Sequence, residues 1–294
     1  MSAQGIVRPR GVRHTLLRLL LFAVLGLFCV VYLMPLVVMV STSLKSLEEV
    51  RSGSLISLPR AISLDAWVKA WGSACVGVRC NGIAPYMWNS VLMVVPAVVI
   101  STLLGAVNGY ALTKWRFRGA DLIFALMLFG AFIPFQIVLL PMARMLGLFG
   151  LAGTTGGLVL VHTVYGLAFT TLFFRNYFVS VSDGIVQAAK IDGAGFFGIF
   201  LRLMLPMAVP AIVVTVIWQF TNIWNDFLFG SAFTVGDSNP VTVALNNVVA
   251  SSTGVKEYNV DMAAAIIAAV PTLLVYVFAG NYFIRGLAAG AVKG

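Results

Sequence analysis

The chain has 294 residues, of which 60% are hydrophobic and only 10% are charged, with a formal net charge of +9 and a mean hydropathy of +0.99. Soluble globular proteins contain about 45–50% apolar and about 25% charged residues, so this chain has too little polar surface to coat a water-soluble fold. Composition therefore excludes a soluble enzyme and a disordered chain. The three cysteines are too few for a disulfide-built scaffold.

Six stretches without formal charge are long and apolar enough to cross a bilayer as helices, which takes about 20 residues. They are Leu19–Val40, Pro85–Thr113, Leu122–Ala143, Thr155–Phe174, Leu203–Asn225 and Met262–Ile284, and the fifth is expected to continue past Asp226. A signal peptide is the alternative for the first stretch, but its apolar run is too long and no small-residue cleavage site ends it. The runs are continuously apolar rather than alternating, which favours helices over a β-barrel. We therefore expect an all-α integral membrane protein with six transmembrane helices.

Basic residues divide unevenly between the two sides of the membrane that these spans define. The side with both termini, the second-to-third loop and the fourth-to-fifth loop carries a net charge of +9, and the other side carries +1, with Asp226 counted on neither. Cytoplasmic loops carry an excess of Lys and Arg, so both termini are expected to be cytoplasmic. The positive charge then sets topology, and no nucleic-acid partner is predicted.

The outer loop from Ser41 to Ala84 is long and polar and contains two of the three cysteines. Cys75 and Cys80 have four residues between them and lie on the side where oxidation is permitted. They either form a local disulfide or remain two unpaired thiols.

In the second span, Gly105 and Gly109 have the small-xxx-small spacing that lets two membrane helices approach closely. Glycine is common in membrane helices, so this spacing alone does not identify an interface.

The cytoplasmic segment Asn176–Pro206 is too long for a simple connection between helices, yet it is not polar. Ser182 is expected to cap a short helix over Asp183–Ile191. Gly193 is expected to end it in the left-handed conformation that a residue with a Cβ adopts only at a cost. A second short helix, about Phe196–Met204, is expected to run into Pro206 at the membrane boundary.

These two short helices are expected to expose a set of small and apolar side chains, namely Ala188, Ala189, Ile191, Phe196 and Phe197. An exposed apolar surface of this kind requires a protein partner or contact with lipid headgroups. Periodicity alone leaves both alternatives open.

The order of residues in this segment resembles the EAA loop of permease subunits in ABC importers, whose pattern is E-A-A-x-x-D-G-A and, ten residues later, L-P-x-x-x-P. The chain matches it with Ala188, Ala189, Asp192, Gly193, Ala194, Leu205, Pro206 and Pro210, and departs from it with Gln187 in place of the usual Glu. In the family, this loop forms a coupling helix in a cleft of the cytoplasmic ATPase subunit. The resemblance assigns that contact to Gln187, Ala188, Ala189, Asp192, Gly193, Ala194 and Pro206.

The resemblance extends over nearly the whole chain and points to sugar-importer permeases of the maltose type. It is carried by Pro35, Ser41–Lys45, Asn89–Ser90, Gly109–Leu112, Trp224–Phe229 and the ending Arg285–Gly294. Two further stretches, Lys114–Gly119 and Val255–Val260, look most like permeases for glucose or mannose.

The resemblance implies a type I ABC importer permease fold in a bacterial inner membrane. It implies a cytoplasmic N-terminus and first transmembrane helix over residues 1–41, a periplasmic loop over 42–85, the transmembrane domain over 86–285 and a cytoplasmic tail over 286–294. The implied partners are a second permease in a heterodimer, two cytoplasmic ATPase subunits, an extracytoplasmic sugar-binding protein and membrane lipid.

Four polar residues of the fifth span share a helical face at spacings of three and four residues, namely Gln219, Asn222, Asn225 and Asp226. Amides donate and accept hydrogen bonds and so suit a pathway for a hydroxyl-rich substrate, whereas hydrogen bonds between helices are the alternative. Asp226 either contacts the sugar or binds a helix end near the interface. His162, in the fourth span, is expected to be a packed polar residue, because no acid lies three or four residues away.

No G-K dipeptide occurs, so the chain has no phosphate-binding loop and is not itself an enzyme that hydrolyses ATP. No catalytic triad, metal cluster or cofactor motif is present in the sequence. An ion-coupled secondary transporter of a small polar solute is the alternative function, but such proteins carry charges inside their spans, and none occurs well inside these six. A membrane scaffold that transports nothing is a second alternative, and it would not need this loop.

Overall fold

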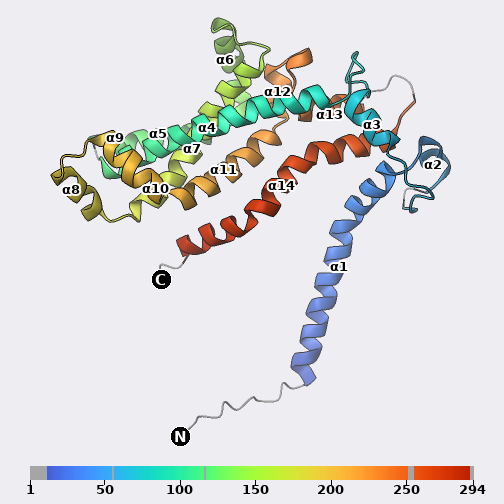
Figure 1. Ribbon diagram of the computed structural model, residues 1–294, viewed down its shortest axis with the longest axis horizontal. Helices are drawn as coiled ribbons and strands as arrows, with labels where there is room; N and C mark the ends of the chain where they lie inside the picture. Colours follow the sequence, from blue (N-terminus) through green and yellow to red (C-terminus); the bar gives the residue numbers. More distant parts are fainter. Residues whose placement is uncertain (1–11, 55, 116, 251–254, 292–294) are drawn as a thin grey trace.

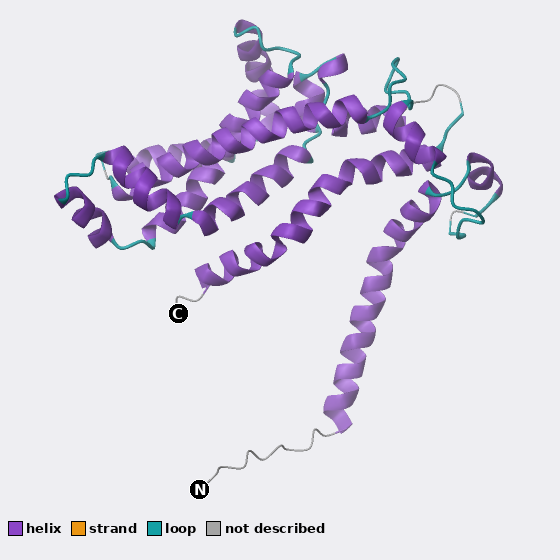
Figure 2. Cartoon of the chain, viewed as in Figure 1, coloured by secondary structure: helices purple, strands orange, loops and turns teal. Residues whose placement is uncertain are grey.

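The structure, a computed structural model, describes residues 12–291 except 55, 116 and 251–254, and it does not describe the side chains of residues 12, 13, 15 and 280 onward. Helices and loops make up all of the described backbone (Figure 2). Four helices within this part are long and apolar enough to cross a membrane: α1 (Val12–Ser43), α4 (Ala84–Lys114), α7 (Thr155–Val179) and α14 (Tyr258–Ala291). Two bent helix pairs bring the possible total to six, which agrees with the predicted all-α membrane fold.

The third predicted span, Leu122–Ala143, is not one straight helix. It is a pair, α5 (Ala120–Ala131) and α6 (Phe135–Leu148), with a bend of 99° between them. Pro134 lies at the break, and proline has no backbone N–H and disfavours helical backbone in the residue before it. The prediction of a continuous helix was therefore wrong at this proline.

The fifth predicted span, Leu203–Asn225, is also divided. Its first residues belong to a π-helical turn over Phe200–Met204 and to α10 (Leu205–Met207), which continue α9 (Phe196–Ile199). This run meets α11 (Val209–Trp224) at a bend of 77°.

The expected continuation of this span past Asp226 was wrong, because α11 ends at Trp224. The Asp226 carboxylate instead accepts hydrogen bonds from the backbone N–H groups of Phe229 (3.3 Å) and Gly230 (3.1 Å) at the start of α12 (Leu228–Phe233). Carboxylates satisfy the free N–H groups of a first helical turn in this way, so Asp226 begins a new helix.

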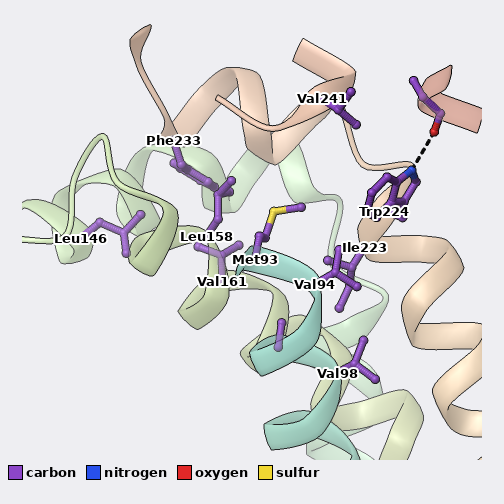
Figure 3. Close-up of a cluster of buried hydrophobic side chains, with 12 residues drawn as sticks. Met93, Val94, Val98, Leu146, Leu158, Val161, Ile223, Trp224, Phe233 and Val241 are labelled. Carbon is purple, nitrogen blue, oxygen red and sulfur yellow. Dashed lines mark hydrogen bonds between the residues drawn. The ribbon is translucent and has the colours of Figure 1, made fainter. Parts of the chain in front are cut away.

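A hydrophobic cluster joins α4, α7 and α11 at the end of the bundle away from α8 (Asp183–Ile191), which we call the outer end, and includes residues of α6, α12, α13 (Val241–Ala250) and α14 (Figure 3). Met93, Leu158 and Ile223 are buried there, and the Trp224 indole N–H donates to the Ala268 carbonyl of α14 at 2.9 Å. The membrane helices are therefore held together at this end.

The outer part of the chain forms a small helical cap. It contains α2 (Leu47–Ser52), α3 (Asp65–Gly72), a 3-10 turn (Gly236–Ser238) and α13 (Val241–Ala250). Buried side chains of α3, α13 and the start of α14 pack into one cluster. The helix α1 diverges from the bundle in Figure 1 and meets α14 near its outer end.

The closest packing in the described bundle is between α4 and α7, at the two glycines of the small-xxx-small pair. A Cβ at Gly105 would lie 2.5 Å from the Thr170 Cβ, and one at Gly109 would lie 2.7 Å from the Phe174 Cβ. Real Cβ atoms do not approach other atoms so closely, so the spacing does mark a helix interface.

Gly109→Ala is expected to destabilise the intact importer by about 1–3 kcal/mol, the usual cost of overpacking. Gly130→Ala is the control, because nothing lies within 4 Å of a Cβ built at Gly130 in α5. The melting temperature of the detergent-purified complex measures the effect. Equal melting temperatures for the two variants would contradict the close approach of α4 and α7.

Candidate functional site

The fourth-to-fifth loop folds as the sequence predicts. Its first helix is α8 (Asp183–Ile191), with the Ser182 hydroxyl accepting a hydrogen bond from the Gly184 N–H at 3.3 Å. Gly193 has a φ of +83°, and the Ala194 N–H donates to the Ala189 carbonyl at 2.9 Å while the Gly193 N–H donates to the Lys190 carbonyl at 3.0 Å. This pair of bonds is the Schellman ending, which favours glycine.

The turn at Gly193 sends the chain into α9, so a helix–glycine–helix unit lies at one end of the bundle. Figure 1 places α8 and α9 at the same end as the C-terminal part of α14. Gln187, Ala188, Asp192 and Gly193 are exposed on it, as is Pro206 beyond it, and Ala194 is half-buried.

The expected exposure of the apolar side chains is only partly right. Ile191 and Phe197 are 86% and 65% exposed, and Ala188 is exposed as well. Ala189 is buried and Phe196 is half-buried, because both face the C-terminal ends of α4 and α7 and join their hydrophobic cluster. The exposed apolar surface is therefore smaller than predicted.

Two neighbouring residues at the end of α4 attach this loop to the membrane helices. The Lys114 ammonium donates to the Val181 carbonyl and forms an ion pair with Asp183, at the start of α8. The Lys190 ammonium lies 4.1 Å from the centre of the Trp115 ring, a cation–π distance. We call Lys114, Trp115 and these three partners the α4 anchor.

Aromatic rings also join the segment after α8 to α4 and its C-terminal end. The Phe196 ring lies 5.3 Å from the Trp115 ring and 4.8 Å from the ring of Tyr110, which is fully buried. The Phe200 ring stacks on Tyr110 at 5.6 Å. A force on α8 or α9 therefore reaches α4 through packed side chains rather than through a flexible loop.

The polar face predicted in the fifth span is divided by the structure. Gln219, Asn222 and Asp226 line one cavity of about 210 Å³. Gln219 is buried and donates to the Ser101 hydroxyl of α4 at 2.8 Å, which is the interhelical hydrogen bond given above as the alternative. The Asn225 side chain lies elsewhere, because it donates to the Thr221 carbonyl and accepts from Thr272.

His162 lines the same cavity, which the sequence did not indicate. Its Nε2 atom lies 3.6 Å from Oδ2 of Asp226, an acid 64 residues away along the chain. A search for acids three or four residues away finds only neighbours on the same helix, so it could not find this pair.

Cys75 and Cys80 form the disulfide that the sequence left open. It closes a short turn of the outer cap, whose tip residue, Val78, is fully exposed. Within the part of the chain that the structure describes, no group of three or more His, Cys, Asp or Glu residues is placed to hold a metal ion.

Comparison with known proteins gives consistent matches along the chain. The family model described as binding-protein-dependent transport system inner membrane component matches residues 1–288. The xylose/arabinose import permease protein XacI of Haloferax volcanii is 32% identical over 90% of each chain. The diacetylchitobiose uptake system permease protein NgcG of Streptomyces coelicolor is 34% identical over 86% of this chain and 82% of its own.

A solved structure supports the fold separately. It is a chain of a bacterial ABC transporter involved in the import of the acidic polysaccharide alginate, with a TM-score of 0.81 at 22% identity. The match covers 94% of this chain and all of that one.

Proposed function

Because the chain belongs to the family of binding-protein-dependent transport system inner membrane components, we propose that it forms half of the sugar pathway of an ATP-driven importer for glucose or mannose. It is a transport subunit and not an enzyme. Family membership also decides against the ion-coupled secondary transporter, since transport in this family depends on a binding protein.

The relatives support a sugar as the substrate. Their names include permeases for xylose and arabinose, diacetylchitobiose and alpha-glucosides. The choice of glucose or mannose rests on the stretches Lys114–Gly119 and Val255–Val260, which look most like permeases for these sugars.

One observation carries the proposal, namely the helix–Gly193–helix unit fixed to α4 by Lys114 and Trp115. Gln187, Ala188, Asp192 and Gly193 offer an exposed surface to the ATPase. Ala189 and Ala194 pack beneath that surface, and Pro206 lies exposed beyond the unit. Closure of the ATPase dimer on ATP pushes α8. The α4 anchor passes that movement to α4 and α7, which changes the side of the membrane to which the pathway opens.

The proposed partners are a second permease in a heterodimer, two cytoplasmic ATPase subunits and an extracytoplasmic sugar-binding protein. A solved neighbour with a TM-score of 0.64 comes from an alginate ABC transporter in complex with a substrate-bound periplasmic protein. No resident cofactor, metal or nucleic acid is part of the proposal.

The proposed location is a bacterial inner membrane with both termini in the cytoplasm. The net charge of +9 on the side of α8 supports this orientation. The proposed transmembrane domain spans residues 86–285, after a cytoplasmic N-terminus and first transmembrane helix over 1–41 and a periplasmic loop over 42–85. Residues 286–294 form the proposed cytoplasmic tail, and α14 continues through the first of these as far as Ala291.

Uptake of labelled glucose, mannose and maltose by a strain lacking this gene tests the substrate. We expect uptake of glucose or mannose to disappear and to return when the gene is supplied on a plasmid. Unchanged uptake of both, with loss of maltose uptake, would contradict the choice of sugar and leave the importer function in place.

A further inference from the structure

The cavity that contains His162 and Asp226 lies in the outer halves of α7 and α11, against the start of α12. We call it the outer cavity. Its volume of about 210 Å³ is below the range of about 300–1,000 Å³ for drug-sized ligands, so it suits a single sugar ring. Its lining combines polar side chains with aromatic rings, the usual composition of a ligand site.

His162 contributes a polar atom without a partner to this cavity. The side chain is only 6% exposed, and its Nε2 has no hydrogen-bond partner among the described residues. The nearest acceptor, Oδ2 of Asp226, is 3.6 Å away, which is beyond hydrogen-bond length. Buried polar atoms are nearly always paired in native proteins, so this one points to a ligand or water.

The geometry of the two side chains fits one hydroxyl group. Two polar atoms that lie 3.6 Å apart can share a third atom at about 2.8 Å from each, once a small rotation of the imidazole brings the buried Nε2 to the cavity surface. A hydroxyl donates one hydrogen bond and accepts others, so it can donate to the Asp226 carboxylate and accept from the imidazole N–H. The carboxylate is held for this role by the Phe229 and Gly230 N–H groups.

Aromatic rings line the rest of the cavity. The Trp218 ring packs 4.9 Å from Phe169, and the Phe229 ring packs 4.8 Å from Tyr165 and 5.7 Å from His162. The faces of aromatic rings carry partial negative charge, and the C–H groups on one face of a sugar ring carry partial positive charge. A ring that binds its hydroxyl at His162 and Asp226 can therefore lay its C–H face on these aromatics.

Gln219 and Gly166 are two further residues that line the cavity, and they are in close contact with each other. A Cβ at Gly166 would lie 1.9 Å from Nε2 of Gln219, so only glycine leaves room for the amide that binds Ser101. Gln219 therefore contacts both α7, at Gly166, and α4, at Ser101, and these contacts fix the position of α11 beside the cavity.

We propose that the outer cavity is a subsite for one sugar ring in the pathway, in which His162 and Asp226 together bind a single hydroxyl. The inference rests on the proposed transport of sugar and adds a binding residue, His162, from outside the polar face of α11. The ring occupies the site on its way from the binding protein toward the inner half of the pathway.

Competition by glucose analogues that each lack one hydroxyl tests this in cells with the complete importer. We expect one monodeoxyglucose to compete at least about tenfold more weakly than glucose against labelled glucose uptake. His162→Phe keeps an aromatic ring and removes both nitrogens, and Asp226→Asn keeps an oxygen that caps α12. Both variants are expected to lose discrimination at that same hydroxyl, and co-purification of the other subunits checks that each variant still assembles.

Asn222 and Asn225 provide a matched pair of variants. Each amide donates to the carbonyl four residues earlier in α11, at 2.8 and 2.9 Å, but only Asn222 lines the cavity. We expect Asn222→Ala to weaken uptake at low glucose concentration and Asn225→Ala to retain it.

The proposal is overturned if both the His162 and Asp226 variants discriminate among the analogues as the unmodified importer does. It is overturned equally if Asn225→Ala impairs uptake as much as Asn222→Ala. Failure of the proposed function has a different signature, because the unmodified importer would then transport neither glucose nor mannose.

Discussion

Replacement of Gly193 by tryptophan is expected to abolish sugar uptake and sugar-stimulated ATP hydrolysis. Gly193 has a φ of +83°, and a residue with a Cβ pays about 1–2 kcal/mol in this conformation. Nothing lies within 4 Å of a Cβ built there, so the new side chain leaves the backbone without a clash at its Cβ among the described residues. It stands instead on the surface proposed to meet the ATPase. Uptake and ATP hydrolysis by the reconstituted importer measure the effect.

Gly195 separates the effect of the backbone from that of the side chain. It also has open space around it, but its φ is −79°, which any residue adopts. Gly193→Ala is therefore expected to reduce uptake severalfold, and Gly195→Ala is expected to leave it unchanged. If Gly193→Trp assembles with the ATPase and retains sugar-stimulated hydrolysis, the coupling role of this turn is wrong.

Loss of the α4 anchor is expected to separate ATP hydrolysis from transport. Lys114→Met leaves the Val181 carbonyl without its donor, at a cost of about 1–3 kcal/mol for a buried group. Trp115→Ala removes the cation–π contact with Lys190, which contributes about 0.5–1 kcal/mol. Since about 1.4 kcal/mol corresponds to a tenfold change, the double variant is expected to move about tenfold less sugar per ATP hydrolysed.

The control for this variant is Arg118→Met, which removes one positive charge from the same face at an exposed position. Sugar uptake and phosphate release are measured in the same proteoliposomes. A double variant that keeps the normal ratio of sugar to ATP would show that α4 does not transmit the movement of α8.

The sequence predicted the fourth-to-fifth loop most accurately because its structure is locally determined. Ser182 caps α8 and Gly193 ends it, and each acts on backbone groups within a few residues. The burial of Ala189 and Phe196 was not predicted, because it depends on the ends of α4 and α7, which are distant along the chain.

Breaks in the membrane helices were the weakest part of the prediction. Hydropathy identifies an apolar segment long enough to span a membrane but not its bends, so the 99° bend at Pro134 and the end of α11 at Trp224 were missed. Pro134 could have predicted the 99° bend. The end of α11 could not be predicted in this way, because it depends on the hydrogen bonds that the Asp226 carboxylate accepts from the Phe229 and Gly230 N–H groups.

The outer cavity was predicted only in part, for a similar reason. Helical spacing placed Gln219, Asn222 and Asp226 on one face of α11, and they do line one cavity. It also included Asn225, which contacts Thr272 of α14, and it could not supply His162 from α7. Contacts between helices determine that Asn225 lies outside the cavity and that His162 lies in it. Spacing along one helix carries no information about contacts with other helices.

We propose that the α8–Gly193–α9 unit contacts the cytoplasmic ATPase. Photo-cross-linking from a reactive amino acid placed at Ile191, 86% exposed on α8, tests it directly in the assembled importer. The same probe at Val78, fully exposed in the outer cap, is the control. We expect a cross-link to the ATPase subunit from position 191 and none from position 78. No ATPase adduct from position 191, or one from position 78, would contradict it.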